Sequence, residues 1–338
     1  MISVATNNAE IGGGEVMLLQ VAEAVAASGR RTQIVAPTGS EVAQEAARRQ
    51  IPVVDLQAET RREWMAALRR WDRGEREGTL WCNGLVPAVA TAGHPDRVIH
   101  LHRFPSSRGQ RVAVKIARAR SRAVVVPSSF LARALGAEAL PNWSPQVVLA
   151  QGSRDHEDLR IGFLGRLTSE KGVCDLAGAV GRLRATGAAV ELVVAGTERF
   201  SDASSTEPID SALRELGPAC RRLGWSEPAA LLGLVDVLAC PSVADEAFGL
   251  VVTEAMSASV PVVVSDAGAL PEVVGPDHPW VARRGDPRDL ARVLSEVAAA
   301  SSDERAAIGE AGRQRWEEHY SPAAGQLRLA DFLERNHL

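Results

Sequence analysis

Short apolar runs alternate with segments of helical period along the whole 338-residue chain. Such runs are typical of strands buried on both faces of a parallel sheet, with helices between them. In the first half the expected strands lie at about 2–6, 32–37, 53–55, 79–82, 98–102 and 123–127. In the second half they lie at about 160–164, 190–195, 220–223, 235–240, 261–265 and 280–281. The pattern predicts an α/β fold in which two doubly wound, Rossmann-like domains face each other across a cleft.

Proline and polar residues interrupt this pattern near the middle of the chain, at 141–145 and 155–158. A stretch of this kind is typical of a linker. We therefore expect an N-terminal domain at 1–145, a linker at 146–158 and a C-terminal domain at 159–320.

The length of 338 residues allows two domains, and 46% hydrophobic residues support a sizeable core in each. The pattern of the cysteines favours the cytoplasm. The four cysteines are scattered without a C-x-x-C pair, which favours buried reduced thiols over a disulfide or a metal site. Met1 runs directly into a strand-like segment, so no opening signal peptide is expected. No apolar run reaches the roughly 18 residues that span a bilayer. The chain is expected to be soluble or peripheral to the inner membrane face.

Charge divides unevenly along the chain, with a formal net charge of +6 on residues 1–145 and −10 on residues 146–338. The stretch from Arg97 to Arg133 holds nine basic residues and no acidic one. A solvated helix face is one interpretation of this stretch. An anionic acceptor or peripheral contact with an acidic membrane surface is the other. Nucleic acid is not expected as a partner, because aromatic residues are sparse there and no nucleic-acid-binding motif is present.

The most specific pattern is the stretch from Asp245 to Glu272, DEAFGLVVTEAMSASVPVVVSDAGALPE. A buried strand is expected before it, and a helical pattern begins at 248–250. The start of that helix presents free backbone N–H groups, which attract phosphate. Glu246 precedes the helix and Glu254 lies one turn inside it. Carboxylates beside a phosphate site indicate hydrogen bonds to sugar hydroxyls.

This stretch resembles the E-x7-E signature of the retaining, nucleotide-sugar-dependent glycosyltransferases of family GT4, whose fold is GT-B. Residues 165–172, GRLTSEKG, are similar to the family's G-R-x-x-x-x-K-G donor loop. Two motifs in the family's order make the resemblance specific. The chain departs from the pattern at Ser259, where the family has a glycine before PVV, and at Ala269, the second glycine of G-G-x-P-E.

The resemblance implies a donor site in the second domain. Arg166 and Lys171 would bind the diphosphate, since arginine offers two parallel donors and lysine a point charge. Glu246 would contact the transferred sugar, and Glu254 the ribose. Backbone N–H groups would bind the distal phosphate at Phe248, Gly249 and Leu250. The remaining donor-side candidates are Gly196, Gly224, Trp225 and Ala247, with Trp225 either packing or contacting the base.

On the acceptor side, the resemblance implies that the glycine loop after the first strand lets the acceptor approach the donor sugar. The candidates there are Gly12, Gly13, Gly14 and Arg103. The loop differs from the dinucleotide fingerprint in its spacing, so a nicotinamide cofactor is not expected. His102 is expected to end its strand, at a position where the family often places a histidine against the donor sugar. A buried, satisfied histidine is the alternative. The last segment, 321–338, would return to pack on the first domain.

The implied activity is that of a retaining hexosyltransferase, with Glu246, His102, Arg166 and Lys171 as the catalytic group. A UDP-sugar is favoured only because UDP is the more frequent donor nucleotide in the family, and the acceptor stays unidentified. No cofactor and no metal are expected, because the chain lacks the D-x-D pair that binds a diphosphate through a divalent ion. Two alternatives remain: a degenerate, non-catalytic nucleotide-sugar-binding protein and a GT-B-type nucleotide-sugar epimerase.

Overall fold

The computed structural model describes residues 1–149, 158–197 and 203–338, and it divides into two compact units. Unit 1 comprises Met1–Trp143 and Pro322–Leu338, and unit 2 comprises Ser144–Ser321. The sequence places the corresponding boundaries at 145 and 320. Most of the expected linker, residues 150–157, lies outside the described residues.

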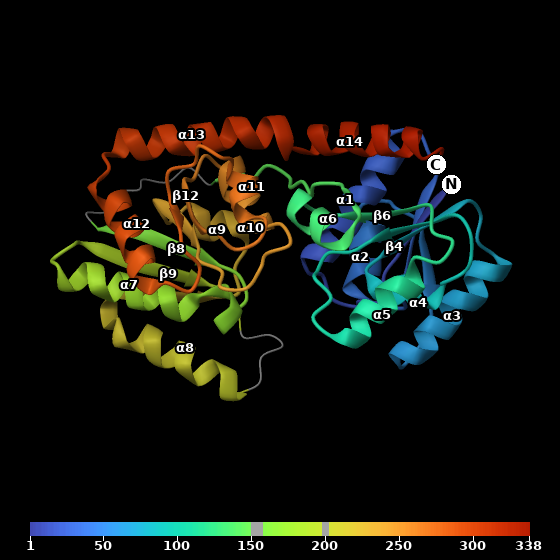
Figure 1. Cartoon of the computed structure of the whole chain (residues 1–338), viewed down its shortest axis with the longest axis horizontal. Coiled ribbons are helices and arrows are strands. Elements are labelled where there is room, and N and C mark those ends of the chain that lie inside the picture. The colour runs from blue at the N-terminus through green and yellow to red at the C-terminus, as the bar shows by residue number, and fades with distance from the viewer. Residues whose placement is uncertain (150–157, 198–202) are drawn as a thin grey trace. The chain divides into compact units, whose positions relative to one another are not determined.

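Unit 1 is a parallel seven-stranded sheet with helices between successive strands (Figure 1). Its strand order is β3-β2-β1-β4-β5-β6-β7, which changes direction between β1 and β4. In chain order its elements are β1 (Ile2–Ala5), α1 (Gly13–Ala27), β2 (Thr32–Pro37), α2 (Glu41–Arg48), β3 (Val53–Leu56), α3 (Arg61–Gly74), β4 (Thr79–Asn83), α4 (Leu85–Ala90), β5 (Arg97–His100), α5 (Arg108–Ala117), β6 (Ala123–Val126), α6 (Ser129–Leu135), β7 (Glu138–Ala139) and the last helix, α14 (Pro322–Arg335).

Unit 2 is a parallel six-stranded sheet of order β10-β9-β8-β11-β12-β13. Its elements are β8 (Leu159–Leu164), the 3₁₀ turn Ser169–Lys171, α7 (Val173–Ala185), β9 (Val190–Ala195), α8 (Ala203–Glu215), the 3₁₀ turn Gly217–Ala219, β10 (Cys220–Gly224), α9 (Pro228–Leu232), β11 (Val237–Cys240), α10 (Leu250–Ser257), β12 (Val262–Ser265), α11 (Leu270–Val274), β13 (Val281–Ala282), α12 (Pro287–Ala299) and α13 (Ser302–His319). The doubly wound α/β fold predicted for both halves is confirmed. Sequence analysis missed the short strand β7.

Successive side chains of the central strands point to opposite faces of the sheet and pack in two different hydrophobic cores. This explains the continuous apolar runs of these strands. In β9, Leu192 and Val194 pack with α7, α8 and α12, whereas Val193 and Ala195 pack with α9, α10 and α11. A strand covered on both faces takes mostly apolar side chains, as at residues 192–195 of β9. This is why the apolar runs identified the strands of the sheet so closely.

The last helix packs within unit 1. Phe332 of α14 joins the core of that unit, and its ring lies edge-on to Trp81, with 5.7 Å between ring centroids. A Cβ atom at Gly325 would lie 2.2 Å from the indole of Trp143, so only glycine allows this approach. The indole N–H of Trp143 donates to Gln20 Oε1 at 3.1 Å. These contacts tie the C-terminal helix to the first sheet.

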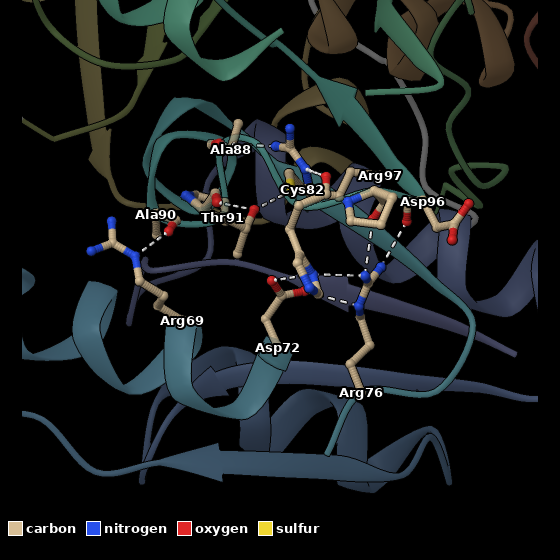
Figure 2. Close-up of polar contacts among 12 residues, drawn as sticks. Arg69, Asp72, Arg76, Cys82, Ala88, Ala90, Thr91, Asp96 and Arg97 are labelled. Carbon is tan, nitrogen blue, oxygen red and sulfur yellow. Dashed lines mark hydrogen bonds and ion pairs between the residues drawn. The ribbon is translucent and has the colours of Figure 1, made fainter. Parts of the chain in front are cut away.

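A buried charge network occupies the amino ends of β4 and β5 (Figure 2). Arg97 has no exposed surface, and it donates to the carbonyl oxygens of His94, Ala88, Ala117 and Ala119. Burial lowers the pKa of its guanidinium. Because Ala88 and Ala117 lie in the last turns of α4 and α5, Arg97 joins the two helices. Arg97 therefore fits neither interpretation of the basic stretch, the solvated face or the contact with an anion or membrane.

Beside Arg97, Asp72 forms an ion pair with Arg76 at 2.9 Å, and Nδ1 of His94 lies 2.9 Å from the same carboxylate. Asp72 is almost fully buried, and desolvation raises the pKa of its carboxyl. Removal of one partner from a buried pair leaves an uncompensated charge. We therefore assign this network to the stability of unit 1.

All four cysteines are free, and burial raises the pKa of the Cys82 thiol to about 11 and of the Cys240 thiol to about 12. Across the described part of the chain, no helix combines the length and the hydropathy that a membrane span requires.

Candidate functional site

The predicted donor residues follow successive strands of unit 2. Residues 165–171 follow β8, residues 196–197 follow β9, residues 224–225 surround the end of β10, and residues 241–249 follow β11. The carboxyl ends of parallel strands lie at one edge of a sheet, where α/β folds bind ligands. The structure thus brings the donor-side candidates to a single edge.

Close backbone contacts between glycines connect the first three loops. The N–H of Gly196 donates to the carbonyl of Gly224 at 2.7 Å. A Cβ atom on Gly196 would lie 1.8 Å from the carbonyl oxygen of Gly165, and its φ of 155° is one that other residues rarely adopt. Gly196 therefore shapes the site through its backbone, and its lack of a side chain is essential.

The backbone of Glu246 is fixed by the loop after β12. The N–H of Ala269 donates to the carbonyl of Glu246 at 2.9 Å. A Cβ atom at Gly268 would lie 2.4 Å from the same oxygen, and φ there is 64°. Ala269 has an ordinary φ of −85°, so an alanine fits where the resembled pattern has glycine. Ser259, the other departure, adopts a φ of 53° that favours glycine.

The carboxylate of Glu246 is held by two donors. Its Oε1 atom lies 2.5 Å from Nζ of Lys171 and accepts a hydrogen bond from Ser242 Oγ at 2.6 Å. The carbonyl of Ser242 in turn accepts from Ser265 Oγ at 2.6 Å. Ser242 and Ser265 are both buried. Sequence analysis missed both serines, because a hydroxyl that orients a neighbouring carboxylate has no spacing signature.

Arg166 differs from Lys171 in its surroundings. It is partly exposed, and within the described residues its guanidinium makes no ion pair or hydrogen bond. Asp245, in contrast, forms an ion pair with Arg284, and this pair joins the loop after β11 to the loop after β13. Of the two predicted donor cations, Lys171 is thus paired with Glu246, whereas Arg166 has no such partner among the described residues.

The start of α10 is open to an anion. Its N-cap is Gly249, with φ of 105° and no side chain to cap the helix. The N–H groups of Phe248, Gly249 and Leu250 donate to no group within the described part of the chain. The Phe248 ring is buried edge-on to Tyr320, with 5.5 Å between centroids. This packing fixes the turn, while Ala247 beside it stays partly exposed.

Glu254 lies one turn into α10 in a setting that disfavours its charge. Burial raises the pKa of its carboxyl to about 7, and the carboxylate of Glu227 adds to the increase. Glu227 precedes α9 and was missed in the sequence. A carboxylate that loses hydration gains most from ligand hydroxyls that donate to it.

Two further side chains near this edge could contact a ligand, one with an exposed ring and one with an unpaired hydroxyl. Trp225 is 67% exposed, which excludes the interpretation of this residue as core packing. The hydroxyl of Thr168, missed by sequence analysis, is buried without a hydrogen-bond partner among the described residues. Exposed aromatic surface and unpaired hydroxyls are frequent in ligand sites.

The acceptor-side candidates lie in unit 1. Gly12 is the N-cap of α1, and Gly13 and Gly14 belong to its first turn rather than to the preceding loop. Glu15, buried and missed by the sequence analysis, accepts from Thr6 Oγ1, Asn8 Nδ2 and the N–H of Gly12. The carboxylate of Glu15 thus joins Gly12, at the start of α1, to the residues that follow β1.

His102 follows β5 rather than ending it, since the strand stops at His100. The two rings lie on the same side, with 4.0 Å between centroids. Burial lowers the pKa of His102 to about 4, and Arg103 contributes to the decrease. A Cβ atom at Gly14 would lie 3.3 Å from Cδ2 of His102, so the glycine loop covers this ring. The neutral imidazole can therefore exchange hydrogen bonds but carries no charge near neutral pH.

The basic stretch separates into internal and exposed residues. Besides Arg97, Arg118 is partly buried and donates to the carbonyl of Leu135. The exposed residues are Arg103, Arg108, Arg111, Lys115, Arg120, Arg122 and Arg133, and Arg122 pairs with Asp96. On α5, Val112 and Ile116 are also 56% and 52% exposed. The outer face of α5 is therefore both basic and partly apolar.

Over residues 1–149, 158–197 and 203–338, no group of three or more His, Cys, Asp or Glu side chains is arranged as metal ligands would be.

Comparison with known proteins shows what most of unit 2 is similar to. Residues 158–299 match the family described as "Glycosyl transferases group 1". The α-maltose-1-phosphate synthase of Mycolicibacterium smegmatis is 32% identical over 52% of this chain and 47% of its own length. The MMP α-(1→4)-mannosyltransferase of Mycolicibacterium hassiacum is 37% identical over 45% of this chain and 36% of its own length. The matched part is thus less than half of each relative.

Solved structures resemble both units. HepE of Anabaena, solved in complex with UDP-glucose, has a TM-score of 0.84 at 20% identity over 99% of both chains. Sucrose-phosphate synthase of Thermosynechococcus elongatus has a TM-score of 0.82 at 17% identity over 99% of this chain and 98% of that one. Residues 158–299 are thus similar to a group 1 glycosyltransferase domain, and the chain as a whole has the GT-B fold of these solved structures.

Proposed function

We propose that this chain is a retaining hexosyltransferase that moves a sugar from a nucleotide diphosphate sugar, with a UDP-sugar favoured, to an acceptor. The observation that carries the proposal is the edge of unit 2, where Lys171, Glu246 and the uncapped start of α10 converge. Cations and helix N–H groups neutralise a diphosphate, and a fixed carboxylate accepts from sugar hydroxyls. The HepE complex with UDP-glucose supports UDP as the first donor to test.

In the proposed mechanism, Arg166, Lys171 and the N–H groups of 248–250 bind the two phosphates. The bond between the sugar and the distal phosphate breaks, and the acceptor oxygen bonds to the same carbon on the same face. The leaving phosphate takes the acceptor's proton, so no separate base is required. Glu246 holds the transferred sugar, and Glu254 and Trp225 hold the nucleoside.

Lys171 must exchange partners in this scheme. In the ligand-free chain its ammonium is paired with Glu246 at 2.5 Å. A bound diphosphate offers more charge, so Lys171 turns to the phosphate while Ser242 keeps the carboxylate in place. Glu246 is then free to accept from the sugar.

The proposal includes independence of a divalent metal and of any cofactor, because the two cations and the helix start supply the positive charge. Activity should survive excess chelator. Loss of activity on chelation, restored by magnesium or manganese, would contradict this part of the proposal.

For the acceptor, we propose an anionic group or an acidic membrane surface on the cytoplasmic side. The support is the outer face of α5, where exposed Arg108, Arg111 and Lys115 lie beside exposed Val112 and Ile116. Basic helices with exposed apolar residues bind anionic lipid surfaces.

The proposed binding of a nucleotide donor is tested by thermal shift over a panel of nucleoside diphosphates. A ligand at 100 times its dissociation constant should stabilise the chain by about 2.7 kcal/mol. No shift with any diphosphate would remove the basis of the proposal. Release of diphosphate with a candidate acceptor distinguishes a transferase from a binding protein, and NMR of the product anomer tests retention.

A further inference from the structure

Asn83 lies between the glycine loop and His102 in unit 1. It ends β4 and is 4% exposed. Its Nδ2 donates to the carbonyl of Gly14 at 3.0 Å, and its Oδ1 lies 2.7 Å from Nε2 of His102. Both groups of the amide are therefore engaged, one with each neighbour.

The first contact fixes the orientation of the amide. A backbone carbonyl only accepts, so the group facing Gly14 must be the NH2, and the oxygen must face His102. An amide oxygen also only accepts. The ring atom Nε2 of His102 must therefore donate, which requires a hydrogen on that nitrogen.

The other nitrogen of the ring then lacks a hydrogen whenever the ring is neutral. The neighbouring charges favour the neutral form: Arg103 is adjacent in sequence, and His100 contacts the ring without adding a negative charge. The Nδ1 atom of His102 is buried and has no hydrogen-bond partner within the described residues. A buried acceptor without a donor is costly, because its lost hydration is not replaced, so a ligand group that donates to it gains a favourable contact.

We infer that Asn83 is a positioning residue that holds His102 as the Nε2–H tautomer and so reserves Nδ1 as an acceptor for a hydroxyl group of a sugar ligand. The identification of the ligand as a sugar rests on the proposed function. The tautomer itself is a property of the ligand-free chain.

The tautomer is measured by long-range ¹H–¹⁵N correlation on the full chain labelled with ¹⁵N-histidine, with His102→Gln to assign the signals. Between about pH 6 and about pH 8 we expect one protonated nitrogen, Nε2, and one bare nitrogen, Nδ1. A ring protonated at Nδ1, or an imidazolium over this range, would overturn the inference.

The role of Asn83 is measured with two variants and a control. Asn83→Leu removes both contacts and should leave His102 as a mixture of tautomers. Asn83→Asp keeps the shape and remains informative if the leucine variant does not fold. Its carboxylate should stabilise the imidazolium, so that His102 titrates at a higher pH than in wild type.

Thr91→Val is the matched control, since it removes another buried hydrogen bond near β4, from Thr91 Oγ1 to the carbonyl of Pro87. Its His102 signals should match wild type. An unchanged tautomer in both Asn83 variants, or the same change in the control, would show that Asn83 does not position the ring.

Kinetic measurements then test whether Nδ1 of His102 accepts from a hydroxyl group of the sugar. Asn83→Leu should lower kcat about tenfold or more with little change in KM for the nucleotide sugar, and Thr91→Val should not. An equal loss in both variants would contradict a positioning role. If wild type binds no nucleotide sugar although His102 is the Nε2–H tautomer, the proposed function fails while the assignment of Asn83 stands.

Discussion

The two units hold their candidate residues by different means. In unit 2, Glu246 is held by an ion pair with Lys171 and by backbone contacts that only glycine permits. In unit 1, His102 and the glycine loop are joined through the amide of Asn83 by hydrogen bonds between uncharged groups. Charge suits a diphosphate, whereas neutral donors and acceptors suit sugar hydroxyls. We propose on this ground that the charged edge of unit 2 supplies the affinity for the diphosphate.

The largest expected difference between the units is the loss of folding stability when a glycine is replaced by alanine. Gly196→Ala should destabilise unit 2 by about 3 kcal/mol or more, because the new Cβ atom would meet a backbone oxygen at 1.8 Å in a strained conformation. Gly14→Ala should cost under about 1 kcal/mol, since its Cβ atom would meet only the His102 ring, at 3.3 Å, within a helix. Urea denaturation measures both. Equal losses would remove the distinction between the two glycine loops.

The two glutamates of unit 2 should separate sugar contact from nucleotide contact. Glu246→Gln should lower kcat by about a hundredfold and leave nucleoside diphosphate affinity nearly unchanged, if Glu246 acts on the sugar. Glu254→Ala should weaken nucleotide and donor alike, by about 1 to 2 kcal/mol. Calorimetric titration of each variant decides this. Identical affinity losses would contradict the assignment.

Glu254 should also make the stability of the ligand-free chain depend on pH. Its pKa is raised to about 7 in the folded chain, against about 4.3 when unfolded. The folded chain therefore binds more protons between these values, and the stability from this group, complete at low pH, is lost as pH rises through about 7. Glu254→Gln should be the more stable form at about pH 8, by about 1 kcal/mol after solvent screening.

Chemical denaturation of wild type and Glu254→Gln at about pH 5 and about pH 8 provides the measurement for this pH dependence. The same dependence in both proteins would show that Glu254 is not its source.

The smallest effect is expected on the outer face of α5. Arg108→Ala with Arg111→Ala should weaken binding to vesicles that contain anionic lipid by up to about 1 kcal/mol per residue, and added salt should reduce the difference. Arg182→Ala with Arg288→Ala removes the same charge from exposed positions in unit 2 and should change little. Binding that neither salt nor the α5 substitutions alter would make this face an ordinary solvated surface.

Sequence alone identified the sheets and the donor loops because both leave local signals. Buried parallel strands such as β9 are continuous apolar runs, and the loops after β8 and β11 carry fixed spacings. The residues it missed act through space. Asn83, Glu15 and Ser242 have no pattern along the chain, and each is identified only by the hydrogen bonds it makes in the fold.

Charge counting along the chain failed for a related reason. Arg97 belongs to an acid-free stretch of sequence, yet its guanidinium is buried among carbonyl groups near Asp72, which precedes that stretch. A run of like charges does not reveal which of its members face solvent. Only the fold separates Arg97 from the exposed Arg108 and Arg111.

The central claim is that the edge of unit 2 binds a nucleotide through its diphosphate. Titration of a nucleoside diphosphate and of the matching nucleoside into wild type and an Arg166→Ala, Lys171→Ala double variant tests it most directly. We expect the double variant to lose about 2 to 3 kcal/mol of diphosphate affinity per cation, while nucleoside affinity barely changes. An equal loss for both ligands, or a diphosphate affinity that the double variant retains, would contradict the account.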